Sequence, residues 1–250
     1  MGDSRMTSRI PEAGVRIPAD VTRIVVLEGP EDKTFFSALA EQLGINDQLH
    51  FITCNGKDCL GSTLENILND GNFHGIQQIG IICDNDFPDS RDGRGALETV
   101  QDEIDEANNA IDESLKTTRK LPRPRKPRET EGTKPKVSVL LLPDDHRDGM
   151  LENLVLDAIG EDNITNCVDA YYACLESQAQ VKLQKAREPR SRLSVYISGK
   201  IVDKTYATND DSRRWFLTQA VDMKWWKDEK MWDKPQFKPA KAFLRQLLKP

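Results

Sequence analysis

Two aspartates, Asp84 and Asp86, stand two residues apart directly after a short apolar run that ends at Cys83. An apolar run bounded by turn-forming residues is typical of a buried strand. The two carboxylates therefore follow the carboxyl end of a predicted strand, where open α/β sheets bind their ligands. Carboxylates this close repel one another unless a charge such as a divalent cation neutralises them. A helix-capping turn is the alternative interpretation, because Asp and Asn are also common at helix N-termini.

Strand and helix patterns alternate around this segment. Apolar runs predict four strands, at 23–27, 49–53, 79–83 and 137–142. Apolar residues at helical spacing predict helices at 31–43, 59–68, 95–115 and 151–159. A further helix is expected at 164–185, and the segment 191–201 is ambiguous. Strands that are apolar throughout indicate a parallel sheet covered by helices on both faces. The expected fold class is α/β, with a Rossmann-like parallel sheet of about four strands flanked by helices and a helical C-terminal extension.

Acidic residues follow three of the four predicted strands. They are Glu28 after the first, Asp84 and Asp86 after the third, and Asp144, Asp145 and Glu152 after the fourth. Because the carboxyl ends of parallel strands share one edge of a sheet, we expect these acids to meet in space. The presence of acids after three separate strands favours a functional site at this edge over helix capping.

Several classes of enzyme and binding site lack their signatures here. Neither a GxGxxG nor a GxxxxGK[ST] motif is present, so dinucleotide and P-loop sites have no phosphate cradle. A GxSxG nucleophile elbow is also missing. Phosphoaspartate receivers and haloacid-dehalogenase-type phosphatases place an essential Asp after the first strand, where this chain has Glu28-Gly29. Five scattered cysteines without a CxxC pair indicate neither a zinc site nor a disulfide framework.

Charge is distributed unevenly along the chain. The net charge is −6, yet residues 116–136 contain nine Lys or Arg and two Glu, a net of +7, which leaves −13 for the remainder. Four prolines and this charge predict a disordered arm without helix or core residues. The arm is either a solvated linker or a contact for the nucleic-acid backbone, the latter through Arg123, Arg125, Lys126 and Arg128.

The composition of the chain also predicts its division into segments and its location. Residues 1–20 resemble a flexible leader, 21–160 the α/β domain with the basic arm inserted, and 161–250 a mainly helical extension. No stretch approaches the roughly 20 apolar residues of a membrane span, and the first residues lack the apolar core of a signal peptide. The expected location is the cytoplasm, and no membrane partner is predicted.

The same acidic motifs resemble those of a known family. Hydrophobic residues before Glu28-Gly29, and again before Asp84-x-Asp86, resemble the two signature motifs of the TOPRIM domain, which topoisomerases, primases, small ribonucleases and OLD-type nucleases share. The stretch EGPEDKTFF at 28–36 resembles the EGxxDxxF start of OLD-like and small stand-alone TOPRIM proteins, some of which are linked to phage defence. Residues 142–159 resemble their third acidic segment. The resemblance covers about 21–159 and implies a TOPRIM-like sheet.

The resemblance also implies roles for particular residues. Glu28 would be a metal ligand or general acid/base, while Asp84 and Asp86 would hold one or two Mg²⁺ or Mn²⁺ ions. Glu152 would complete the site, and the candidate outer ligands are Asp32, Asp144 and Asp145. OLD-type nucleases use a lysine some tens of residues after the last acids. The cations in that region are Lys182, Lys185, Arg190 and Arg192. For most of them, a position on a solvated helix face is the simpler interpretation. Lys57 is a candidate phosphate contact, and Lys182 and Lys185 are further candidate contacts for nucleic acid.

The expected function is metal-dependent hydrolysis of DNA or RNA phosphodiesters, by a nuclease that could act as a phage-defence or toxin-like effector. One alternative is a noncatalytic TOPRIM-like module that binds nucleic acid, nucleotide or protein. Another is a phosphohydrolase of small molecules. The partners expected beside nucleic acid are a separate ATPase or regulatory protein and a second copy of the chain.

Overall fold

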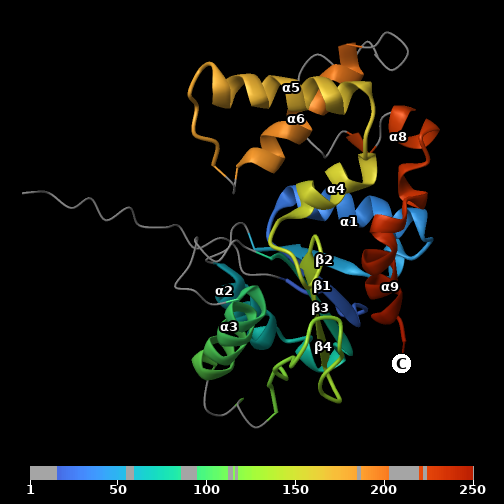
Figure 1. Cartoon of the computed structure of the whole chain (residues 1–250). Helices are drawn as coiled ribbons and strands as arrows, with labels where there is room; N and C mark the ends of the chain where they lie inside the picture. Colours follow the sequence, from blue (N-terminus) through green and yellow to red (C-terminus); the bar gives the residue numbers. More distant parts are fainter. Residues whose placement is uncertain are drawn as a thin grey trace, which may run out of the picture.

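Within its described residues, the chain forms four parallel strands on which the other elements are built (Figure 1). The computed structural model describes residues 16–54, 59–85, 95–111, 115, 118–184, 187–202, 220–221 and 224–249. The spatial order of the strands is β2-β1-β3-β4. Their bounds are Arg23–Leu27 for β1, His50–Thr53 for β2, Gln78–Asp84 for β3 and Lys136–Leu142 for β4. The predicted α/β class and the parallel sheet are confirmed.

The register of the sheet brings the carboxyl ends of the strands level with one another. Leu27 in β1 lies beside Thr53 in β2 and Ile82 in β3. Asp84 in β3 lies beside Leu142 in β4. The residues that directly follow the strands therefore share one edge, which is the geometry that parallel pairing predicts.

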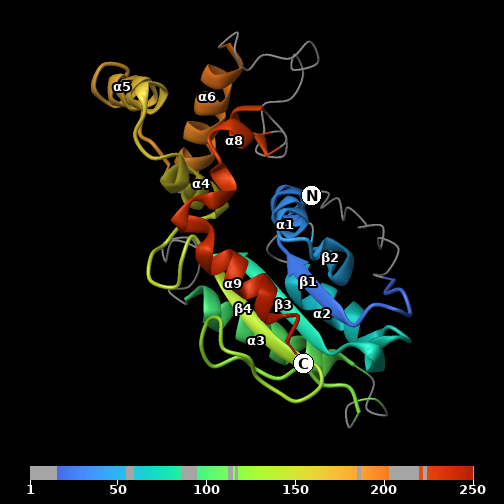
Figure 2. The ribbon, with the colours of Figure 1, turned by 90° about the vertical axis from the view of Figure 1, so that its right-hand side faces the viewer.

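Two layers of helices enclose the sheet (Figure 2). One face packs against α1 (Pro30–Gln42), α4 (Leu151–Ile159) and α9 (Lys238–Gln246). The same apolar cluster continues away from the sheet into α5 (Asn163–Ser177), α6 (Glu188–Val202) and α8 (Lys224–Asp228). The other face packs against α2 (Leu60–Asn69) and α3 (Ala96–Ala110). Trp225 and Trp226 are fully buried, and Trp226 contacts Phe35 of α1, so these C-terminal aromatic residues pack onto the sheet domain.

Some predicted helix bounds were wrong. The helix predicted at 164–185 ends at Ser177, and the one predicted at 95–115 ends at Ala110. The ambiguous segment 191–201 belongs to the 15-residue helix α6. Single 3-10 turns also occur, at Asn46–Gln48 (η1), Phe73–Gly75 (η3), Met231–Asp233 (η5) and Pro235–Phe237 (η6). None of the described helices combines the length and the apolar composition needed to cross a bilayer.

The basic arm contains no helix over its described residues 118–136, as predicted, but it is packed against the domain. The Leu121 side chain is only 1% exposed, and Asn108 of α3 pairs with the Leu121 backbone through bonds of 2.9 and 2.8 Å. Further along, Glu131 forms an antiparallel bridge with Val137 at the start of β4. The prediction of a disordered arm without core residues is therefore wrong for these residues, because Leu121, Pro124 and Pro135 are buried and the backbone of β4 provides hydrogen-bond partners.

Candidate functional site

Glu28 and Asp84 meet at the carboxyl edge of the sheet. The backbone N–H of Asp84, the last residue of β3, donates to Oε1 of Glu28, which directly follows β1, at 3.1 Å. The Asp84 Oδ1 atom accepts the N–H of Leu151, the first residue of α4, at 3.1 Å. Asp84 thus faces the positive N-terminal end of that helix, which favours a carboxylate. The expected convergence of these two acids is present, and part of the capping interpretation also holds for Asp84.

Arg190 of α6 bridges acids from two other helices. Its Nε atom donates to Oε1 of Glu152 at 2.7 Å, and its Nη2 lies 3.5 Å from Oε2 of Glu31. Glu152 is only 4% exposed, so this contact compensates a buried charge. The hydrogen bond to Glu152 raises the pKa of Arg190, aided by the charges of Glu31 and Asp84 and opposed by burial. Because Glu152 is held by Arg190, its predicted role as a metal ligand is disfavoured.

Asp32 shows how strongly negative charge accumulates at this edge. Its Oδ2 accepts the N–H of Gly29 at 2.9 Å, which closes the first turn of α1 directly after Glu28. The pKa of Asp32 is raised to about 7, mainly by burial and also by the charges of Glu28 and Glu152, while the Gly29 hydrogen bond lowers it. Burial also raises the pKa of Glu31, although Arg190 opposes this shift. The edge therefore holds more negative charge than its neighbouring cations offset.

The other acids predicted here are engaged elsewhere. Asp144 Oδ1 accepts the N–H of His146 at 2.9 Å, and Asp144 Oδ2 lies 3.4 Å from Nε of Arg147. Asp145 forms an ion pair with Arg128 of the basic arm. These contacts hold the turn after β4 and fix the arm to it. They disfavour Asp144 and Asp145 as outer metal ligands.

The residues predicted to contact nucleic acid fall into two groups. Arg123 is 2.7 Å from Asp105 of α3, so it holds the arm on the domain together with Arg128. The side chains of Arg125 and Lys126 are 83% and 72% exposed. Lys182 is exposed in the segment that follows α5. The predicted site residues Lys57, Asp86 and Lys185 lie outside the described residues.

Whether the edge suits a metal ion depends on its donor atoms and their number. Within the described part of the chain, no group of three or more Asp, Glu, His or Cys side chains is arranged to hold a metal ion. Glu28 and Asp84 supply two hard carboxylate donors of the kind that Mg²⁺ and Mn²⁺ prefer. The crowding that raises the pKa of Asp32 favours a divalent cation for the same electrostatic reason. The donor chemistry fits such an ion, with Asp86 as the predicted further ligand.

Glu31 was not predicted as part of this edge, and Arg190 was considered only as one of several cations. The position of Glu31 in the first turn of α1, directly after Glu28-Gly29-Pro30, could have indicated it. No pattern in the sequence indicates that Arg190 reaches Glu152, because the contact depends on how α6 crosses α4.

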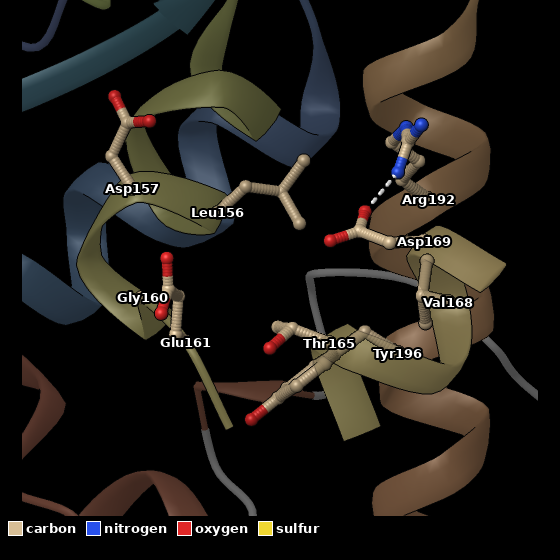
Figure 3. A pocket seen from close by; sticks show the side chains of 9 residues that line it. All are labelled: Leu156, Asp157, Gly160, Glu161, Thr165, Val168, Asp169, Arg192 and Tyr196. Carbon is tan, nitrogen blue, oxygen red and sulfur yellow. Dashed lines mark hydrogen bonds and ion pairs between the residues drawn. The ribbon is translucent and has the colours of Figure 1, made fainter. Parts of the chain in front are cut away.

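A separate cavity of about 190 Å³ opens between α4, α5 and α6 (Figure 3). The residues that line it are Leu156, Asp157, Gly160, Glu161, Thr165, Val168, Asp169, Arg192 and Tyr196. Arg192 pairs there with Asp169 and lies over the ring of Tyr172, with 4.4 Å between the guanidinium carbon and the ring centroid. Its contacts make Arg192 a structural link between α5 and α6. Of the candidate residues from the sequence, Arg192 lines this cavity, while the acids of the sheet edge do not.

Residues 22–249 match the sequence profile of a family described as "Protein of unknown function (DUF3226)". The chain belongs to this family. The match begins one residue before β1 and ends at the last described residue, so the DUF3226 unit includes the sheet, the arm and the C-terminal helices. No curated protein and no solved structure matches the chain. Membership of the DUF3226 family therefore does not indicate an activity or a ligand. The functional proposal is based on the geometry of the edge.

Proposed function

We propose that the protein is a metal-dependent nuclease that hydrolyses phosphodiesters of DNA or RNA at the carboxyl edge of the sheet. The observation that carries the proposal is the contact of 3.1 Å between the Asp84 N–H and Glu28 Oε1. It joins the two acidic motifs that resemble those of TOPRIM proteins, from strands that are neighbours in the sheet. Glu28, Asp84 and Asp86 would hold Mg²⁺ or Mn²⁺.

The charge at this edge supports a cation-dependent reaction. Burial, together with the charges of Glu28 and Glu152, raises the pKa of Asp32 to about 7, and the negative charge of these acids repels a phosphodiester backbone. A bound divalent cation would neutralise the phosphate oxygens and lower the pKa of a water molecule.

Hydrogen bonds within the protein orient the carboxylates of the proposed site. Glu28 is fixed by the Asp84 N–H, and Asp84 is fixed by the Leu151 N–H, so both carboxylates are positioned before a ligand arrives. Arg190 holds Glu152 while its side chain remains 62% exposed. That exposure leaves the guanidinium accessible to a phosphate oxygen beside the acids, which is a contact that guanidinium groups make well. In this arrangement Glu152 is a positioning residue for Arg190.

A noncatalytic binding module is the second candidate. The observation that favours it is the lack of a three-ligand group within the described residues, together with the ion pair that neutralises Glu152. On this alternative the edge would bind an anion through Arg190 without hydrolysing it.

The two candidates are separated by incubating the purified protein with plasmid, linear DNA and structured RNA in EDTA, Mg²⁺ or Mn²⁺. Glu28→Gln removes one carboxylate charge but keeps the acceptor for the Asp84 N–H. Glu41→Gln, an exposed position at the end of α1, is the matched control. We expect metal-dependent cleavage by the wild-type protein and Glu41→Gln, and its loss in Glu28→Gln and in EDTA. Nucleic-acid binding without cleavage under all conditions would favour the noncatalytic module.

A further inference from the structure

Helix α9 presents a cationic stripe on its exposed side. Lys238 and Arg245 lie seven residues apart on one face of the helix, and Lys249, three residues beyond its end, continues the stripe; all three side chains are exposed. Residues 234–249 contain five Lys or Arg and no Asp or Glu, although the whole chain is acidic. The opposite face is apolar, since Phe243, Leu244 and Leu247 are buried. The stripe is therefore a charged surface that packing does not require.

The basic arm lies directly beside this helix. Gln246 Nε2 donates to the backbone oxygen of Arg128 at 2.9 Å and lies 2.6 Å from Oγ1 of Thr130. Figure 2 shows α9 running alongside β4, the strand whose outer edge the arm covers. Two basic segments more than 100 residues apart in the sequence therefore form one surface.

The exposed cations of the arm are weakly committed to other partners. Arg125 Nε lies 3.7 Å from Glu131, and Lys126 Nζ lies 3.3 Å from Glu129. Ion pairs of such exposed cations contribute little, so phosphate oxygens can replace the carboxylates. Arg128 differs, because it pairs with Asp145 just beyond the carboxyl end of β4. The arm thus connects the stripe on α9 to the acidic edge of the sheet.

The spacing of the stripe matches a phosphate backbone. With a rise of about 1.5 Å per helical residue, Lys238 and Arg245 are separated by about 10 Å along the axis. This interval corresponds to about three phosphates at about 3.4 Å per nucleotide of one strand. Exposed cations of this kind contact the backbone regardless of sequence.

We propose that the exposed face of α9 and the basic arm together bind the sugar-phosphate backbone of a nucleic acid and lead it to the acidic edge. The proposal rests on the nuclease function, of which it names the substrate-binding surface. The residues expected to contact phosphates are Lys238 and Arg245 on α9, Lys249 just beyond it, and Arg125 and Lys126 on the arm.

The test measures fluorescence anisotropy of labelled single-stranded and duplex oligonucleotides of DNA and RNA, in EDTA, over a range of NaCl concentrations. Three double variants each remove two positive charges from exposed positions. Arg245→Gln/Lys249→Gln alters the helix, Arg125→Gln/Lys126→Gln alters the arm, and Lys227→Gln/Lys230→Gln, in and just after α8, is the matched control. Unlabelled poly-L-glutamate is included as a competitor.

We expect each of the first two variants to bind about tenfold more weakly at moderate salt. The dependence of log K on log salt concentration should also become shallower by about 0.7–0.9 for each lost contact. The control should stay within about twofold of the wild-type protein, and poly-L-glutamate should compete poorly. Circular dichroism of all variants should match that of the wild-type protein, because the altered side chains are exposed.

Several outcomes would overturn the inference. Wild-type affinity in the helix variant, or an equal loss of affinity in the control, would show that the stripe is not the binding surface. The absence of nucleic-acid binding by the wild-type protein would also overturn the inference. Competition by poly-L-glutamate as strong as that by unlabelled DNA would indicate an acidic protein partner instead. Failure of the two proposals can be distinguished. Binding that depends on the stripe without any cleavage removes the nuclease function alone, whereas cleavage by a helix variant of unchanged affinity removes the binding surface alone.

Discussion

The N–H of Asp84 and the carboxylate of Glu28 are hydrogen-bonded at 3.1 Å, although 56 residues separate them in the chain. The contact follows from the pairing of β1 with β3, in which Leu27 lies beside Ile82. It places two acids at the edge where parallel α/β sheets bind ligands. The proposed nuclease function depends on this pair, while the surrounding acids and Arg190 set the charge of the site.

Replacing Arg190 by Gln should destabilise the fold. The change leaves the carboxylate of Glu152, which is 4% exposed, without its ionic partner. Because Arg190 is itself largely exposed, we expect a loss of about 1–3 kcal/mol in the free energy of unfolding rather than the larger cost of a fully buried pair. Urea denaturation measures it. Arg187→Gln, just before α6, is the control and should change stability by less than about 0.5 kcal/mol.

A double-mutant cycle separates the ion pair from other effects of this change. In a protein that already carries Glu152→Gln, Arg190→Gln should lower the free energy of unfolding by clearly less than it does in the wild-type protein, because no buried carboxylate is then left unpaired. Equal costs in both backgrounds would mean that the contact between Arg190 and Glu152 does not stabilise the protein.

The stability of the metal-free protein should fall as the pH rises from about 4 to about 7. The pKa of Asp32 is about 7 in the folded protein and about 3.9 in an unfolded chain, so the folded state binds the extra proton within this window. Asp32→Asn keeps an oxygen for the Gly29 N–H but cannot ionise. It should be more stable than the wild-type protein above pH 7, by about 2–4 kcal/mol, and similar to it near pH 4. Melting curves in EDTA at several pH values measure this difference, and parallel pH profiles for the two proteins would contradict the predicted crowding.

Gly80→Ala should destabilise the packing of the C-terminal helix on the sheet. A Cβ atom at Gly80 in β3 would lie 2.6 Å from Cδ1 of Leu247 and 3.1 Å from Cε1 of Phe243. We expect a cost of about 1–3 kcal/mol, because the side chains of a packed core would have to move. Gly71→Ala is the matched control, since nothing lies within 4 Å of the added atom. Thermal unfolding measures both, and equal melting temperatures would show that the end of α9 is loosely packed on β3.

The sheet and its acidic edge could be predicted because apolar runs and the acids that follow them are local features. The conformation of the arm could not, since counting charges and prolines overlooks the buried side chain of Leu121 and the backbone partners that β4 offers. The role of Arg190 also could not be predicted, because its contact with Glu152 spans 38 residues and depends on the crossing of two helices. Helix α6 was obscured because its buried side includes Pro189 and Lys200 among apolar residues.

The central claim is tested most directly by the initial rate of phosphodiester cleavage, measured against Mn²⁺ or Mg²⁺ concentration for the wild-type protein and Asp84→Asn. The variant keeps an oxygen for the Leu151 N–H and loses one negative charge, so its metal-free form should remain folded. We predict that the wild-type rate rises with metal concentration to saturation, and that the variant is slower by about 100-fold or more, because a lost ligand removes several kcal/mol of transition-state stabilisation. Superimposable rate curves for the two proteins would contradict the account.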